Sequence, residues 1–212
     1  MSGIQQMLSG GTYKPALPTV IGQAYGGGFY AGKINVSGTQ YYLIVSPKAS
    51  GETSAAWGVF GVTTGTTSVI DGPTNSADLA ALGALYAAAT FCEGLTIGGY
   101  SDWYLPAKNE LEVLYYFLKP TTTANDTGSG SNANAVSPEP YNTNYTSGNP
   151  AQTSAGIGFR TGETNAFISN YYSSSTEKNS SSVEDQDFAD GRQSGDSKSD
   201  SLNVRAVRRI PV

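Results

Sequence analysis

The sequence predicts an α+β domain from two kinds of periodicity. Runs rich in aromatic and β-branched residues occupy positions 29–36 and 41–45 on either side of a short polar turn, which is the pattern of a β-hairpin. Apolar residues spaced three and four positions apart indicate two helices, over residues 76–93 and 106–119. Helices flanked by strands on both sides favour one main α+β domain in this chain of 212 residues.

The expected first helix, residues 76–93, is defined by its start and by its apolar stripe. Ser76 is a suitable N-cap. Behind it Leu82, Leu85 and Cys92 recur with the spacing of one helical face. We therefore expect these three side chains in the core, with the Cys92 thiol chemically inert.

The most information-dense stretch, residues 98–111, leads into the second helix. It combines a glycine pair, one of the two tryptophans of the chain and a proline placed where a helix can begin. We interpret it as a structural hub, a loop that folds back on itself and then starts a helix. The residues assigned to this hub are Asp102, Trp103, Leu105, Pro106 and Glu110.

Polar segments divide the rest of the chain. Residues 1–18 contain the pair Gly10-Gly11 and two prolines and predict an extended arm that attaches to another component, before a domain over residues 19–212. Long polar loops are expected at 121–155 and 173–201. The closing run, residues 202–210, alternates apolar and polar positions and predicts a strand.

Composition excludes several classes of chemistry. The chain has no histidine and a single cysteine, so it can form neither a Ser-His-Asp triad nor a His-based zinc site. The glycines Gly26-Gly27-Gly28 precede a strand rather than a helix, which indicates a tight backbone crossing and not a phosphate-binding loop. The net charge of −5 and the pI near 4.6 argue against nucleic acid as a partner.

The N-terminal residues have neither a basic region nor a long apolar run, so the sequence predicts no signal peptide, and no stretch has the length of a membrane span. Low charge combined with abundant Gly, Ser, Thr, Asn and Tyr is typical of a surface protein rich in turns and strands. Together these features favour a protein that is made in a cytoplasm and works in a particle released by lysis.

Several separated motifs suggest a family. In chain order they are Gln23-Ala24-Tyr25-Gly26-Gly27-Gly28, Trp57-Gly58, Cys92-Glu93-Gly94-Leu95, Asp102-Trp103-Tyr104-Leu105-Pro106, Asp190-Gly191 and Val204-Arg205-Ala206-Val207-Arg208. Over residues 19–210 this arrangement resembles the Lcl C-terminal domain family, which comprises C-type-lectin-like domains of bacterial adhesins and phage tail proteins. The segments 31–34 and 46–52 are most similar to the tail-fibre versions from bacteriophages.

The resemblance implies a C-type-lectin-like fold with two helices, a mixed and mainly antiparallel sheet, and long surface loops. The first and last strands would lie side by side, with a long excursion between them. Within the hub, Asp102 would accept backbone hydrogen bonds and Trp103 would fill the core. The tyrosines at 171 and 172 depart from the tryptophan-containing signature of the family, which leaves the register there open by one residue.

The densest polar constellation follows those tyrosines, and three interpretations compete. It can be a solvated loop face, a receptor-binding surface in which tyrosines meet sugar rings and short polar groups meet hydroxyls, or a calcium site. Calcium is the weakest of the three, because the alternating Asp-x-Asp-x-Asp-Gly pattern is absent. The candidate ligand-binding residues are Tyr171, Tyr172, Glu177, Asn179, Glu184, Asp185, Asp187, Arg192, Asp196 and Lys198.

Binding is favoured over catalysis. A glycosidase needs two acids across a cleft, one of them with a raised pKa, and a serine-rich tract offers no evident apolar pocket to raise it. The sequence therefore predicts a receptor-binding tail fibre that recognises the host surface non-covalently through its C-terminal loops, with a glycan as the favoured receptor. It predicts neither enzyme activity nor a cofactor. It would be a virion protein, attached to other tail or baseplate proteins by residues 1–18, and a homo-oligomer, with a trimer favoured.

Two alternatives stay open. A structural tail or baseplate component would use the same lectin-like domain for contacts between virion proteins. A hypervariable display protein would explain why Asn, Ser, Asp and Tyr crowd the tract before a regular Val-Arg-Ala-Val-Arg ending.

Overall fold

The computed structural model describes residues 16–155 and 158–212. The predicted arm, residues 1–18, therefore falls almost entirely outside the described residues. The described chain folds into an α+β arrangement of two sheets and four helices, which confirms the predicted class. None of the helices in these two ranges is long and apolar enough to cross a bilayer.

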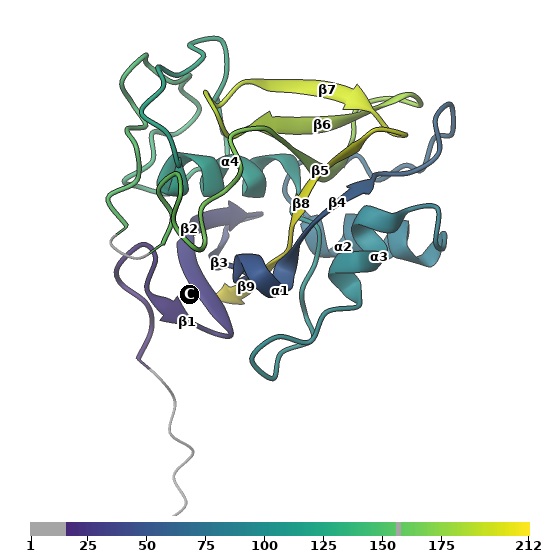
Figure 1. Ribbon diagram of the computed structural model, residues 1–212, viewed down its shortest axis with the longest axis horizontal. Helices are drawn as coiled ribbons and strands as arrows, with labels where there is room; N and C mark the ends of the chain where they lie inside the picture. Colours follow the sequence, from purple (N-terminus) through teal and green to yellow (C-terminus); the bar gives the residue numbers. More distant parts are fainter. Residues whose placement is uncertain (1–15, 156–157) are drawn as a thin grey trace, which may run out of the picture.

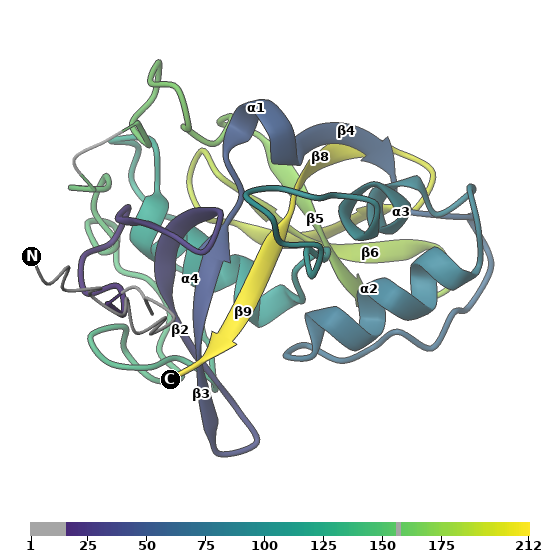
Figure 2. The same ribbon diagram turned by 90° about the horizontal axis from the view of Figure 1, so that it is seen from below.

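The first sheet contains the predicted hairpin. Its strands are β1 (Ala24–Tyr25), β2 (Gly28–Val36), β3 (Thr39–Val45) and β9 (Val207–Pro211), in the order β1-β2-β3-β9, and all neighbours are antiparallel. The last strand, β9, thus lies beside β3 (Figure 2). The first strand, which was expected to be its neighbour, lies at the opposite edge of the sheet.

The second sheet holds the polar tract. Its strands are β4 (Glu52–Ala56), β5 (Tyr171–Glu177), β6 (Ser182–Asp187), β7 (Gln193–Ser197) and β8 (Ser201–Arg205), in the order β4-β8-β5-β6-β7. Only β5 and β8 run parallel; the other neighbours are antiparallel.

Two expectations are corrected by this sheet. The tract 173–201, expected to be a loop, instead forms most of three strands, because its polar residues alternate between the two faces of a sheet. The predicted single strand at 202–210 is interrupted at Ala206, so that β8 joins the second sheet and β9 the first.

The expected first helix also differs. Two helices replace it, α2 (Gly72–Ala81) and α3 (Ala87–Glu93). The chain turns between them at Gly83, which has a φ of +96° that glycine alone adopts readily. As a result Leu82 and Leu85 are 54% and 71% exposed instead of packing in the core.

Ser76 is not the N-cap. It lies inside α2, and its hydroxyl accepts a hydrogen bond from the backbone N–H of Leu105 in the hub. Pro73 occupies the first turn of the helix, where its missing N–H costs nothing.

The second predicted helix is α4 (Lys108–Leu118), and a short helix, α1 (Lys48–Gly51), links β3 to β4. Helix α4 is packed between the two sheets, against β2 on one side and β5 and β6 on the other (Figure 1). It approaches β2 at Gly32, where a Cβ atom would lie 2.6 Å from the Phe117 ring. A side chain at position 32 would therefore push the helix off the sheet.

The triple glycine forms the expected backbone crossing. A Cβ atom on Gly98 would lie 2.5 Å from the Cα of Gly27, and one on Gly27 would lie 2.7 Å from the carbonyl oxygen of Ile97. Both glycines have positive φ. The start of the first sheet and the start of the hub are thus in direct backbone contact.

The excursion 121–155 contains no helix or strand among its residues, yet it is anchored by buried polar groups. The Lys119 ammonium donates to the carbonyl of Thr123 and, at 2.7 Å, to Asn125. On the other side, the carboxylate of Glu112 from α4 accepts from Tyr145 and Asn132, each at 2.7 Å. These contacts make the excursion an ordered part of the fold.

A carboxyl pair completes this anchor. Glu139 is 4% exposed and hydrogen-bonded to Glu112, and burial together with that neighbour raises its pKa far above the usual value. With both groups ionised, neither oxygen of Glu139 would have a donor. A proton on Glu139 would let it donate to Glu112, and the raised pKa of Glu139 favours that protonated form at neutral pH.

Candidate binding surface

The hub connects both sheets to the helices. Trp103 is 1% exposed and fills the core as expected, and its indole N–H donates to the carbonyl of Tyr100. The backbone of Tyr104 pairs with Val207 of β9, and the carbonyl of Pro106 accepts from Ser175 of β5. Leu105 is fully buried.

The role of Asp102 is different from the expected one. Its carboxylate accepts no backbone hydrogen bond but binds the Arg208 guanidinium through both oxygens, at 2.7 and 2.8 Å. The same guanidinium stacks 3.8 Å from the centre of the Tyr100 ring. Asp102 therefore holds β9 by a bidentate ion pair, and its side chain is 55% exposed.

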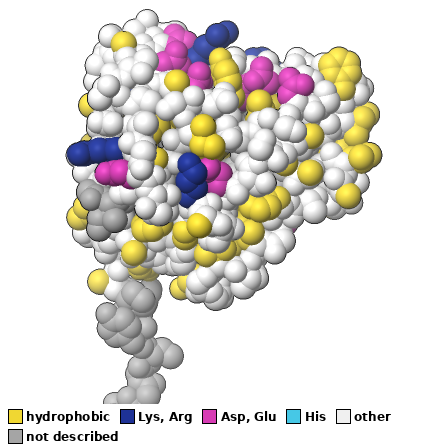
Figure 3. Space-filling view, viewed as in Figure 1, with side chains coloured by type: hydrophobic (Ala, Val, Ile, Leu, Met, Phe, Trp, Pro, Cys, Tyr) yellow, Lys and Arg dark blue, Asp and Glu magenta, His cyan; other side chains and the backbone are white. Residues whose placement is uncertain are grey.

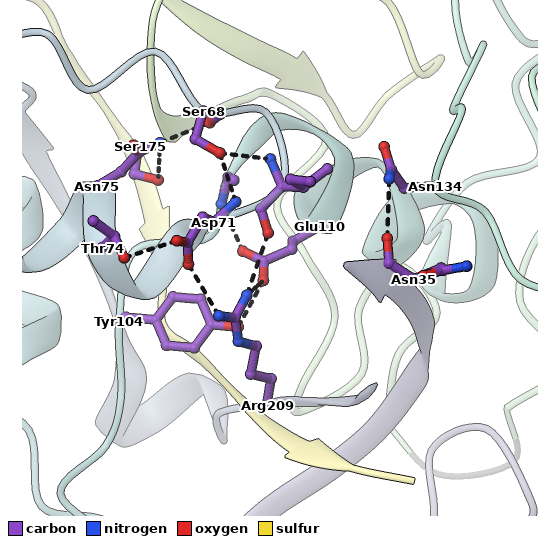
Figure 4. Close-up of polar contacts among 12 residues, drawn as sticks. Asn35, Ser68, Asp71, Thr74, Asn75, Tyr104, Glu110, Asn134, Ser175 and Arg209 are labelled. Carbon is purple, nitrogen blue, oxygen red and sulfur yellow. Dashed lines mark hydrogen bonds and ion pairs between the residues drawn. The ribbon is translucent and has the colours of Figure 1, made fainter. Parts of the chain in front are cut away.

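Glu110 anchors the start of α4. Its carboxylate accepts from the Ala107 N–H and from the Tyr104 hydroxyl, both at 2.9 Å, and burial raises its pKa to about 7. Arg209 from β9 lies 3.6 Å from Glu110 and donates to Asp71 at 2.9 Å (Figure 4). The hub residues thus form hydrogen bonds and ion pairs that join elements far apart in the sequence.

Three of the ten predicted ligand-binding residues are buried in structural contacts. Tyr172 lies in the core with its hydroxyl donating to Glu52 at 2.8 Å. Glu177 and Lys198 form a buried ion pair, and the carboxylate also accepts from the backbone of Thr64 and Gly65. These three side chains are inaccessible to a ligand.

Two further members of the set have local roles. The Asn179 side chain accepts from the backbone of Ser181 and Ser182, which closes the β5–β6 turn. Glu184 lies 3.1 Å from Lys108 of α4, so it points to the inner side of the sheet.

The remaining members come together on the opposite side of the second sheet. Tyr171 on β5 is paired in register with Asp187 on β6, and Asp185 is paired with Ser194 on β7. Residues two apart on a strand share a face, so one surface unites the side chains of these strands. We call this surface the acidic sheet face; it comprises Tyr171, Asp185, Asp187, Arg192 and Asp196.

Charges on the acidic sheet face act on one another. The pKa of the Tyr171 hydroxyl is raised, first by desolvation and then by Asp187, while Arg192 opposes the shift and Asp185 and Asp196 add to it. The other four side chains of this face therefore lie within electrostatic reach of the Tyr171 ring. In the space-filling view, acidic and basic side chains gather over β5–β7 (Figure 3).

Asp185 forms the floor of this surface. It is 2% exposed, and one of its carboxylate oxygens accepts from the Ser194 hydroxyl at 2.7 Å. The other oxygen has no hydrogen-bond partner among the described residues, and the same is true of the buried Ser173 hydroxyl. Burial raises the pKa of Asp185 to about 6, so the expectation that this tract could not raise the pKa of an acid is wrong. Sequence reasoning missed Ser173 and Ser194, which the alternation of β5 and β7 places beside Tyr171 and Asp185.

The described residues contain no group of three or more His, Cys, Asp or Glu side chains placed to hold a metal ion. The acids of the acidic sheet face are spread along three strands, with Arg192 among them.

The described chain is an α+β domain in which two sheets enclose a helix and an accessible polar sheet face lies on one of them. The lectin-like, adhesin-type class of this domain follows from its family match. Residues 53–208, well over half of the chain, match the family model of the Lcl C-terminal domain. The chain belongs to this family, which confirms the resemblance seen in the sequence. No curated protein matches the chain significantly.

Proposed function

We propose that the protein is a receptor-binding tail-fibre protein of a bacteriophage, and that it binds the host surface through the acidic sheet face. The proposal rests on one observation: the polar tract contains both buried side chains and accessible ones. The side chains of Tyr172, Glu177 and Lys198 are used by the core, whereas Tyr171, Asp187 and Arg192 are left accessible on a rigid sheet.

The chemistry of the face suits recognition better than catalysis. Tyrosine offers a large amphipathic ring at low entropic cost, and short polar side chains beside it can meet hydroxyl groups. Carboxylates and one guanidinium give a glycan both acceptors and donors. A single such site binds weakly, so we propose a homo-oligomer, with a trimer favoured, in which several copies act together. The protein would be made in the host cytoplasm and joined to the tail by residues 1–18.

The test is adsorption of the assembled oligomer to host cells and to a glycan array. Tyr171→Ala should lower binding at least about tenfold, because contact residues near the centre of an interface dominate its energy. Tyr141→Ala is the matched control, since Tyr141 is 67% exposed and lies in the excursion. Equal effects of the two variants, or no binding by the unaltered oligomer, would overturn the proposal.

The same variants address the structural alternative. If the domain serves only as a tail or baseplate connector, Tyr171→Ala would give particles that assemble poorly while adsorption per assembled particle stays unchanged. Sequencing the 173–201 segment in many isolates would test the hypervariable display alternative, which predicts changes on the acidic sheet face and none at the buried positions.

A further inference from the structure

A cavity of about 260 Å³ opens beside the hub, next to the acidic-basic cluster of Figure 4. It shares no lining residue with the acidic sheet face and stands independently of the proposed function. Its lining residues are Pro73, Glu93, Asp102, Trp103, Tyr104 and Arg209.

The positive charges at this cavity are already paired. Both oxygens of Asp102 accept from the Arg208 guanidinium. Arg209 donates to Asp71 and lies 3.6 Å from Glu110, whose pKa is raised by burial to about 7. Neither guanidinium is left over to neutralise another carboxylate.

Glu93 is the carboxylate that remains. It is the last residue of α3, half-buried, and among the described residues no Lys or Arg forms an ion pair with it. Burial raises its pKa, and a hydrogen bond to Ser76 offsets this only partly. The carbonyl groups at the end of a helix also disfavour a negative charge there. The cavity therefore places one uncompensated negative charge beside apolar walls.

We propose that this cavity binds a small molecule or terminal sugar that carries a primary ammonium group, with the ammonium on Glu93 and the carbon body along Pro73 and Tyr104. The size fits a small ligand, because cavities for drug-sized molecules span about 300 to 1,000 Å³. An ammonium ion supplies the missing charge and several donors. A phosphate or a carboxylate would instead meet the unpaired Glu93 charge and be repelled.

Glucosamine and N-acetylglucosamine make a matched pair of probes, because acetylation removes the charge and keeps the ring. Titration of the full chain, followed by NMR shifts of the Trp103 indole N–H, should show binding of glucosamine roughly ten- to hundredfold tighter than of the acetylated sugar. Equal binding of the two sugars, or binding of neither, would overturn the proposal. Ethanolamine, a third probe, has the ammonium group but no sugar ring. If ethanolamine and glucosamine both bind, the site recognises the ammonium group and does not require the ring.

Glu93→Gln is the decisive variant, and Glu163→Gln, on the exposed surface, is its control. Glu93→Gln should abolish the preference for glucosamine while Glu163→Gln retains it. Loss of folding is not expected, because the substitution removes a partly desolvated charge. Glucosamine should raise the thermal midpoint of the unaltered chain and of Glu163→Gln but not of Glu93→Gln. A midpoint that rises equally in all three would place the ligand elsewhere.

Discussion

Two regions of the second sheet use the same residue types for opposite purposes. In the inner region, at the end of β5, Glu177 forms an ion pair with Lys198, and both side chains are at most 2% exposed. In the outer region, at the start of β5, Asp187 and Arg192 flank Tyr171 and keep their contact with water. Acidic residues in this serine-rich tract are therefore part of the core or part of the surface according to what covers each position of the sheet.

The largest expected effect follows from breaking the inner pair. Lys198→Met leaves the Glu177 carboxylate buried without its cation and also removes the contact with the Trp57 ring. The free energy of unfolding should fall by about 3–5 kcal/mol, measured by urea denaturation. Lys178→Met, at a lysine whose side chain is 41% exposed, should change it by less than about 0.5 kcal/mol. Similar losses in the two variants would contradict the division between the buried and the exposed region.

The next effect concerns the carboxyl pair that holds the excursion to α4. The folded-state pKa of Glu139 lies above its ordinary value of 4.5, so the stability it contributes is full below that pH and is lost as pH rises through the folded-state pKa. Between pH 6 and pH 9 the unaltered chain should lose about 4 kcal/mol more stability than Glu139→Gln, whose amide can donate to Glu112 at any pH. Parallel pH profiles would show that no proton is shared.

A smaller change is expected at the floor of the acidic sheet face. The pKa of Asp185 is raised from 3.8 to about 6, so its favourable contribution is complete below pH 3.8 and declines as pH rises through 6. Asp185→Asn should therefore increase the free energy of unfolding at pH 8 by about 3 kcal/mol. The same substitution at pH 3.5 should be close to neutral, and a loss of stability at both pH values would mean that the ionised carboxylate holds the strands together.

The smallest effect on stability is expected on the exposed part of that face. Arg192→Gln and Asp196→Asn should each change the free energy of unfolding by no more than about 0.5 kcal/mol in thermal or urea denaturation. Adsorption to host cells should nevertheless weaken several-fold. If either substitution costs as much as Lys198→Met, the outer face is part of the scaffold.

Much of the fold could be predicted from the sequence because local patterns determine it. The hairpin of β2 and β3 and the helix α4 follow from periodicity, and Trp103 was correctly placed in the core. The break at Gly83 was missed because Leu82 and Leu85 match a helical stripe by spacing, and spacing does not report the positive φ of the glycine between them. Likewise, Asp102 was given backbone donors because its partner, Arg208, is more than a hundred residues away.

The candidate site was only half predictable for a physical reason. Composition identified the polar tract as a candidate binding segment. It could not separate Tyr171 from Tyr172, which are adjacent and chemically identical, because only the pairing of β5 with β6 decides which of them faces the core. In the sequence Glu93 is recognisable only as part of a family motif, and nothing there indicates that its charge is unpaired. The Glu93 carboxylate lacks a cation because the two nearby guanidiniums, Arg208 and Arg209 on β9, form ion pairs with other carboxylates.

The interruption at Ala206 has a consequence for biosynthesis. The short segment that carries β8 and β9 supplies an edge strand to the first sheet and an interior strand to the second, pairing with residues about 150 positions earlier. Neither sheet can be completed until this segment has left the ribosome. The nascent chain therefore carries two incomplete sheets until β8 and β9 emerge, and their open edges must be kept from pairing with those of neighbouring chains.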